Sequence, residues 1–314
     1  MLGAVGAFGT GCMVQANAVA AAVDGALPLG PLPVAVGLSI LAGAAILGGI
    51  RSIASVAEKL VPLMAAGYVA GCLGILAMNR AVLGRTLQVI LVSAIRPGAA
   101  LGGAAGYGVA AACRHGVARG LFSNESGMGS APLAAASAQT RNPKRQALVS
   151  MTGTFWDTGV ICLLTGLALV SSTLAEPEIE PTLGAGLAAL AFSRIPYVGS
   201  AVLRSGLAVF AFTTILGWYC YGERCAVYLL GEGCVPVYKA LWVAGVFAGA
   251  LGELEVIWSL ANLLNGLMAI PNLTGLLLLR KEVAAETERF AGERLAQWDT
   301  RPVPQAPDTG AKAG

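Results

Sequence analysis

Long apolar runs follow one another along most of this chain, and they constrain its fold more than any other feature. Each run is rich in Ala, Gly, Val and Leu, and the runs cover residues 1–23, 34–50, 60–78, 147–170, 198–221, 235–251 and 256–279. A helix needs about 20 such residues to cross the lipid core of a membrane. The pattern therefore predicts an all-α polytopic membrane protein.

Composition excludes several other classes of protein. Charged residues make up 12% of the chain, whereas a soluble domain has about 25%. The net charge of +3 is too small to argue for a nucleic-acid partner. Seven cysteines without a CxxC pair, and one histidine, argue against a zinc or iron–sulfur site. The sequence also lacks a nucleotide-binding loop and a hydrolase triad, so we expect neither enzyme activity nor a cofactor.

One further apolar stretch has a polar centre. Residues 122–130 read FSNESGMGS, which places a carboxylate, an amide, three hydroxyls and two glycines where a spanning helix normally carries Leu and Val. A helix that unwinds at membrane depth needs such groups, because its freed backbone N–H and C=O groups require partners. Broken helices of this kind build substrate and ion sites in secondary transporters. Counted with the other runs, this broken helix gives about eight transmembrane helices.

The residues of this break have a functional and a structural interpretation. Glu125 is an ionisable group at membrane depth, which is a candidate for function by default; alternatively it pairs with Arg119 or caps backbone N–H groups. Gly127 and Gly129 permit backbone conformations that other residues resist. With Ser123 and Asn124 they can present carbonyls to a cation and N–H groups to a carboxylate; the alternative is a flexible kink without a ligand.

Other polar residues in the apolar runs have the same two interpretations. Thr214 and Trp218 share one face of a helix, and the hydroxyls of Thr213 and Thr214 suit a hard cation. A Thr in a membrane helix more often bonds its own i−4 carbonyl. The amides of Gln15 and Asn17 fit hydrogen bonds between helices. We expect Asp157 to pair with a nearby Arg or Lys.

Basic residues predict the orientation of the chain in the membrane. By the positive-inside rule, the cluster at 141–145, the GER turn at 222–224 and the start of the charged helix at 280–298 lie in the cytoplasm. The apolar piece LQVILVSAI within residues 79–98 is too short to span and predicts an interfacial or re-entrant helix. We expect a transporter domain over 1–282 and a cytoplasmic tail over 283–314, disordered at its end.

Five segments of this sequence closely resemble blocks of the alanine or glycine:cation symporter family. The blocks are GCMVQANAVAAAV (11–23), GLFSNESGMGSAP (120–132), TRNPKRQALVSMTGTFWDT (140–158), FAFTTILGWYCYGE (210–223) and NLLNGLMAIPNLTGLLLL (262–279). The resemblance implies a leucine-transporter-like fold of two inverted five-helix repeats. In that fold residues 1–23 are similar to helix 3, the break to helix 6 and residues 198–221 to helix 8.

The resemblance also implies a function and a set of site residues. It implies sodium-coupled uptake of alanine or glycine across the bacterial or archaeal plasma (inner) membrane, with no cofactor beyond the coupling ion. The substrate-side positions that it implies, together with Gly127 from the break, are Gln15, Phe122, Ser123, Asn124, Gly127, Thr214 and Trp218. The sodium positions are Thr213 and Thr214, and we assign structural or gating roles to Arg119, Glu125 and Gly129.

The chain departs from this family at its beginning. The first two helices of the family have no counterpart, so we expect an N-terminally truncated version of the fold that holds about half of the site. Two alternatives remain open. One is a remnant that does not transport, and the other is a transporter driven by protons, with Glu125 as the proton carrier.

Overall fold

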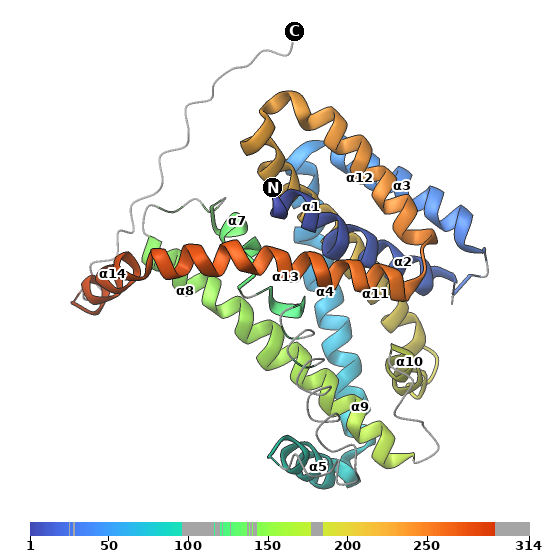
Figure 1. Ribbon diagram of the computed structural model, residues 1–314. Helices are drawn as coiled ribbons and strands as arrows, with labels where there is room; N and C mark the ends of the chain where they lie inside the picture. Colours follow the sequence, from blue (N-terminus) through green and yellow to red (C-terminus); the bar gives the residue numbers. More distant parts are fainter. Residues whose placement is uncertain are drawn as a thin grey trace, which may run out of the picture.

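The computed structural model describes residues 1–24, 26–27, 29–95, 116, 120, 122–125, 127–136, 138, 140, 143–176 and 185–292. Every regular element within these ranges is a helix, as predicted (Figure 1). The end of the tail, which we expected to be disordered, lies outside the described residues, and so does Arg119.

The first rod of the structure packs into a bundle that contains most of the buried core. The rod consists of α1 (Leu2–Ala7), the π-helix η1 (Phe8–Met13) and α2 (Val14–Asp24). It packs against α11 (Gly199–Leu230), α12 (Val235–Leu251) and α13 (Leu254–Leu278), while α3 (Pro31–Leu47) lies alongside α12. Figure 1 shows α13 running across the front of this bundle and continuing into α14 (Arg280–Gly292).

A second group of helices extends away from this bundle. The group comprises α4 (Gly49–Met78), η2 (Arg80–Val82), α5 (Leu83–Ile95), α8 (Pro143–Thr154), the π-helix η4 (Phe155–Cys162), α9 (Leu163–Ala175) and α10 (Ala185–Ser193). The rod α8–η4–α9 packs on α4 through α9, and α5 lies at the far end of this pair (Figure 1). Between the two groups lies the short helix α7 (Ser130–Ala136), which contacts both α8 and α11.

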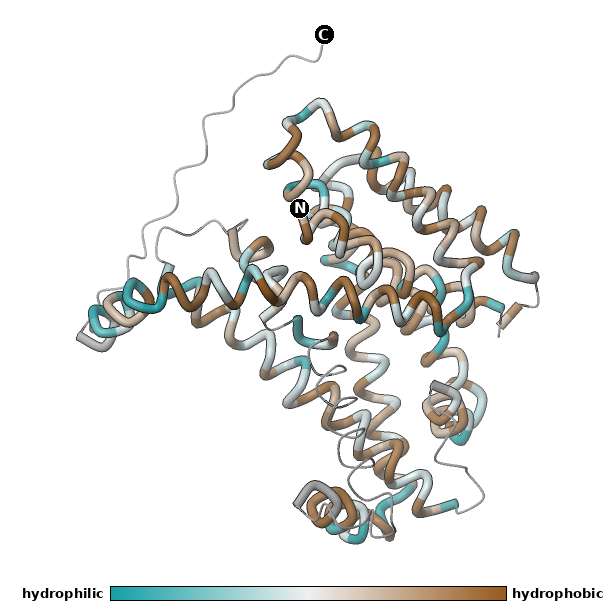
Figure 2. Tube along the Cα trace, in the orientation of Figure 1, coloured by the Kyte–Doolittle hydropathy of each residue, from teal (hydrophilic) through white to brown (hydrophobic). Residues whose placement is uncertain are grey.

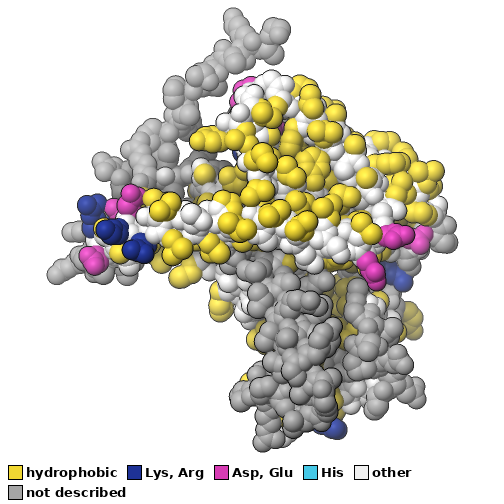
Figure 3. Space-filling view, viewed as in Figure 1, with side chains coloured by type: hydrophobic (Ala, Val, Ile, Leu, Met, Phe, Trp, Pro, Cys, Tyr) yellow, Lys and Arg dark blue, Asp and Glu magenta, His cyan; other side chains and the backbone are white. Residues whose placement is uncertain are grey.

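Six of the helices in the described part of the chain are long and apolar enough to cross a membrane. They are Leu2–Asp24, Ser52–Met78, Pro143–Ala175, Gly199–Leu230, Glu232–Leu251 and Leu254–Leu278. The apolar helix α3 has 17 residues and is shorter. Figure 2 shows hydrophobic residues along much of these helices. In Figure 3 hydrophobic side chains cover the outer face of α13, whereas charged side chains gather on α14. This surface is suited to lipid.

Small residues allow the helices of the bundle to approach closely. A Cβ atom placed on Gly249 of α12 would lie 2.5 Å from the Cα atom of Met13. A Cβ atom on Gly222 of α11 would lie 1.9 Å from the Tyr238 hydroxyl oxygen, and that hydroxyl donates to the carbonyl of Ala4 over 2.9 Å. Close packing of this kind is the main source of stability between helices in lipid, which offers no hydrophobic driving force of its own.

The predicted ends of several helices were wrong. The GER turn at 222–224 lies inside α11, because Gly222 packs against Tyr238; the helix continues to Gly231, whose φ of +79° permits the reversal there. The helix α13 also continues through Pro271 without a break. Neighbouring groups satisfy the backbone beside a proline in a packed membrane helix. The predicted limits of α12 were confirmed.

A buried polar cluster joins the far ends of α4 and α9. The side-chain amide of Asn79 donates to the hydroxyls of Ser171 and Ser172 over 3.1 and 3.3 Å. Its carbonyl accepts a hydrogen bond of 3.1 Å from Arg194, which also forms a 3.0 Å ion pair with Glu176. Asn79 and Glu176 are the residues that end α4 and α9, so the guanidinium lies at the negative ends of two helices.

We expect Asn79→Ala to lower the stability of the protein. The change leaves buried donors and acceptors without partners, which costs about 1–3 kcal/mol of unfolding free energy. The apparent melting temperature of the purified protein in detergent measures this loss. Asn262→Ala, at an exposed position of α13, is the matched control. Equal melting temperatures for the two variants would contradict a stabilising role for the cluster.

Candidate ligand site

The structure contains the break that the sequence predicted within residues 122–130. Residues 122–124 are helical, Glu125 and residues 127–129 are not, and α7 begins at Ser130. Glu125, Gly127 and Gly129 have φ angles of +56°, +84° and +89°. The left-handed conformation is natural for glycine, but in Glu125 it costs on the order of 1–3 kcal/mol. Such a conformation persists when neighbouring contacts hold it in place.

Two helices supply those contacts. Trp218 of α11 donates its indole N–H to Oε1 of Glu125 over 2.9 Å. Asn272 of α13 donates its amide to the carbonyl oxygen of Gly127, also over 2.9 Å. A Cβ atom on Gly129 would lie 3.2 Å from Oδ1 of Asn272, so this position favours glycine for space as well as conformation. The break is therefore fixed on both sides by side chains from elsewhere in the fold.

Trp218 is itself positioned by the first rod. The residue is buried, and its ring lies over Gly11 of the π-helix η1, where an added Cβ atom would lie 2.1 Å from the Trp218 side chain. The ring of Tyr221 meets the indole edge-on, with 5.7 Å between ring centroids. A π-helix is rare and frequently marks a functional site. The missing side chain at Gly11 is what allows the indole to reach Glu125.

Polar groups of η1 lie beside this contact. Thr10 hydrogen-bonds through its hydroxyl to the side chain of Asn265 on α13. Gln15 donates its amide to the backbone carbonyl of Thr10 over 3.2 Å. Gln15 thus contacts the π-helix next to Trp218, and its role in substrate binding stays a prediction. Asn17 bonds the carbonyls of Gly249 and Gly252, which is the predicted hydrogen bonding between helices.

The two threonines predicted to bind sodium bond to their own helix. Thr214 donates its hydroxyl to the carbonyl of Phe210 over 2.8 Å, and Thr213 donates to the carbonyls of Val209 and Phe210 over 3.0 and 2.9 Å. This was the alternative interpretation of these residues. A hydroxyl that donates still has lone pairs to offer a cation, so the ion-binding role stays a prediction.

The first residues of the break contact η4. Ser123 donates its hydroxyl to Oδ2 of Asp157 over 2.8 Å, and the amide of Asn124 lies 3.4 Å from the hydroxyl of Thr158. Within the part of the chain that the structure describes, Asp157 bonds a hydroxyl of the broken helix in place of the expected Arg or Lys. Phe122 packs against Trp258 of α13, with 4.7 Å between ring centroids.

Sequence reasoning missed three residues of this neighbourhood, namely Thr10, Thr158 and Asn272. Each is a polar residue in an apolar stretch, as are Gln15, Thr213 and Thr214, which the reasoning selected. Nothing in the local pattern distinguishes them, because their importance depends on which helices meet. The expected pair of Arg119 with Glu125 lies outside the described residues.

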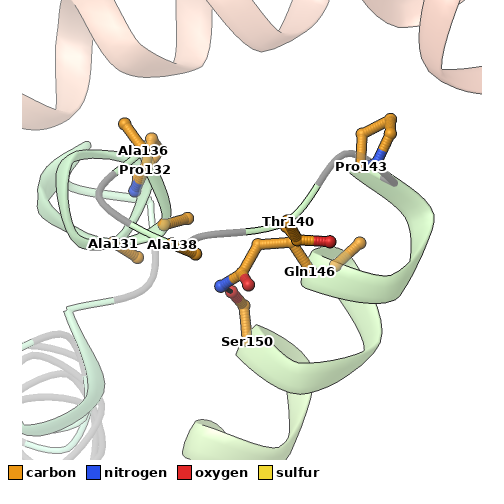
Figure 4. A pocket seen from close by; sticks show the side chains of 10 residues that line it. Ala131, Pro132, Ala136, Ala138, Thr140, Pro143, Gln146 and Ser150 are labelled. Carbon is orange, nitrogen blue, oxygen red and sulfur yellow. Dashed lines mark hydrogen bonds between the residues drawn. The ribbon is translucent and has the colours of Figure 1, made fainter. Parts of the chain in front are cut away.

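One cavity in the described part of the chain lies away from these contacts. It has a volume of about 580 Å³ and lies between α7 and α8. Figure 4 shows its walls, which are mostly alanines and prolines, with Thr140, Gln146 and Ser150 as polar members. None of the predicted site residues lines this cavity. It adjoins the predicted site through α7, whose first residue follows the break.

Comparison with known proteins agrees with the sequence resemblance. Residues 1–304 match the sodium:alanine symporter family. The chain is 46% identical over 289 residues to the sodium/alanine symporter AgcS of Methanococcus maripaludis, covering 92% of this chain and 63% of that protein. It is 45% identical over 286 residues to an uncharacterized transporter of Haemophilus influenzae, covering 90% of this chain and 62% of that protein. It is 34% identical over 291 residues to the probable sodium/glutamine symporter GlnT of Bacillus subtilis, covering 91% of this chain and 59% of that protein.

The similarity extends over nearly the whole chain. The chain spans about three fifths of the length of these curated relatives. On this evidence the chain is a multi-pass membrane protein, it is not an enzyme, and it belongs to the sodium:alanine symporter family.

Proposed function

We propose that this protein takes part in sodium-coupled symport of a small neutral amino acid, alanine or glycine, across the plasma membrane. The observation that carries the proposal is the break at Glu125–Gly129, held open by Trp218 and Asn272. At this point the backbone can give N–H groups to a carboxylate and carbonyls to a cation. The relative named for alanine, at 46% identity, favours alanine over the larger glutamine of the 34% relative.

The proposed site assigns a role to each group around the break. The backbone between Glu125 and Gly129 binds the charged end groups of the amino acid, and Ser123, Asn124 and Gln15 supply polar contacts. Phe122 and Trp218 face the substrate side chain and leave no room for bulk. The hydroxyls of Thr213 and Thr214 bind sodium, and Gly129 gives the break its shape.

We also propose how these helices fit into a leucine-transporter-like inverted repeat. In this arrangement α1–η1–α2 is helix 3, the break is helix 6 and α11 is helix 8. Residues 1–282 form the transporter domain and residues 283–314 the cytoplasmic tail. The contact of Trp218 with both Gly11 and Glu125 supports this arrangement, because it brings the three helices together at one point.

Uptake of radiolabelled alanine into proteoliposomes that contain the chain tests the proposal. We expect an inward sodium gradient to drive alanine uptake. When choline replaces sodium, we expect that uptake to be abolished. Uptake that follows a pH gradient and ignores sodium would contradict sodium coupling and select the proton-driven alternative. The absence of binding and uptake under both gradients would contradict the proposal and identify a remnant that does not transport.

We expect Trp218→Ala to weaken selection for small substrates. Removal of the indole opens space over Gly11. Larger neutral amino acids should therefore compete with labelled alanine at concentrations about tenfold lower than in the wild type. A tenfold change corresponds to about 1.4 kcal/mol of binding free energy. Competition assays measure this change. Tyr228→Ala, on the same helix at a position that is 90% exposed, is the control. An unchanged competition profile would remove Trp218 from the substrate pocket.

We expect Thr214→Val to raise the sodium concentration required for half-maximal uptake. The valine keeps the shape of the side chain and removes the hydroxyl oxygen, and the loss of one ligand should raise that concentration by about three- to tenfold. Thr274→Val is a matched control, because Thr274 makes the same i−4 bond at an exposed position of α13. The same sodium dependence in both variants would exclude Thr214 from the ion site.

A further inference from the structure

A groove lies between the start of α8 and the junction of α13 with α14. Its volume is about 370 Å³, which is within the range of about 300–1,000 Å³ that is typical of small-molecule sites. Figure 1 shows the start of α8 beside the point where α13 continues into α14, and the two helices α8 and α14 are in contact. None of the predicted site residues lines this groove.

The position of the groove places it at a membrane surface. Pro143, on one wall, begins the span Pro143–Ala175, and Leu279, on the other wall, directly follows the span Leu254–Leu278. Two spans therefore reach the same surface of the membrane at this point. The residues beyond, 280–289, read RKEVAAETER and are mostly charged. The groove thus lies at the level where the hydrocarbon of a bilayer gives way to its headgroups.

The lining of the groove is apolar on both walls although charged residues surround it. Leu148 lines it from α8, and Leu279 and Val283 line it from the other side. Val283 is the only large apolar residue within 280–289, and its side chain is 56% exposed. Apolar surface exposed at the edge of a membrane is stabilised when an acyl chain covers it.

The two walls also carry charges of opposite sign. Lys144 lines the groove from α8, and Glu282 and Glu286 line it from α14. Glu286 pairs with Arg289 over 2.8 Å, whereas Glu282 belongs to neither of the ion pairs found in the described part of the chain. A ligand that matches these walls carries a cation for Glu282 and an anion for Lys144, a few ångströms apart.

The start of α8 strengthens the side of the groove that suits an anion. The first backbone N–H groups of a helix have no partner within it and carry partial positive charge. Helix α8 has 12 residues and begins at Pro143, so this positive end lies beside Lys144. A phosphate is the anion that such a helix end binds most readily, and the three donors of a lysine ammonium can serve it as well.

We propose that this groove binds a zwitterionic phospholipid with a primary ammonium group, for which phosphatidylethanolamine is the probe. The phosphate contacts Lys144 and the start of α8, and the ammonium contacts Glu282. An acyl chain covers Leu148 and Val283 and continues into the bilayer. The site is separate from the break and does not depend on the proposed symport.

A lipid in this groove connects helices that adjoin the break. Helix α13 contacts the break through Asn272, which is seven residues before Leu279. Helix α8 contacts α7, whose first residue follows the break. The bound lipid therefore braces both helices against each other at the membrane surface.

Thermal unfolding of the purified chain in detergent, over a series of lipid concentrations, tests the site. Phosphatidylethanolamine is compared with phosphatidylglycerol, which lacks the ammonium, and with phosphatidylcholine, whose ammonium has no N–H donors. All three lipids have the same acyl chains. A ligand that binds the folded state raises the melting temperature. We expect phosphatidylethanolamine to reach half-maximal stabilisation at a concentration about threefold lower than either of the others.

We expect Glu282→Gln to remove this preference, so that the three lipids stabilise the variant at equal concentrations. Glu288→Gln is the matched control, because Glu288 is an exposed carboxylate of α14 that does not line the groove. Val283→Ser keeps the charges and removes apolar contact, so it should raise the half-maximal concentration of every lipid by about threefold. All three positions are exposed, and the variants are therefore expected to fold.

Each contrary result overturns the proposal in a different way. Equal stabilisation of the wild type by the three lipids would contradict recognition of the headgroup, and stronger stabilisation by phosphatidylglycerol would identify an anionic lipid as the occupant. The same lipid preference in Glu282→Gln and Glu288→Gln would place the lipid elsewhere on the protein. A melting temperature that rises with protein concentration and ignores lipid would identify a second copy of the chain as the occupant.

Discussion

The hydrogen bond between Trp218 and Glu125 is the contact on which the arrangement of the site depends. It joins α11 to a residue that has left the helical conformation, and it helps to hold that residue at an unfavourable positive φ. The bond forms because Gly11 has no side chain, so the indole can lie against η1. A larger residue at Gly11 would displace Trp218, and the break would lose its partner on that side. One glycine in the first rod thus controls the geometry of a segment more than a hundred residues away.

Two π-helices flank the break, and each carries polar residues toward the helices around it. The first, η1, supports Trp218 and bonds through Thr10 to Asn265. The second, η4, presents Asp157 and Thr158 to Ser123 and Asn124. Helical distortions of this kind are uncommon and frequently mark functional sites, so their position on either side of the break fits the proposed substrate site.

The apolar runs and the polar break predicted the helical class, the position of the break and the first and penultimate spans. Predictions from these patterns were wrong where a residue far away in the sequence determines the local structure. The sequence predicted a turn at Gly222, but this glycine packs closely against Tyr238 and lies inside α11. Asp157 suggested an ion pair, yet among the described residues it accepts a hydrogen bond from Ser123, which is 34 residues away along the chain. Such pairings follow from the way the helices pack, and periodicity within one segment contains no information about them.

Hydrogen–deuterium exchange of the purified protein tests the central claim most directly, which is that the segment around Glu125 binds both alanine and sodium. Exchange of residues 122–130 is compared with sodium alone, with sodium and alanine together, and with choline in place of sodium. The account predicts that sodium slows exchange in this segment, that alanine with sodium slows it further, and that α14 is unaffected. Protection by alanine at other helices, with residues 122–130 unchanged, would contradict it.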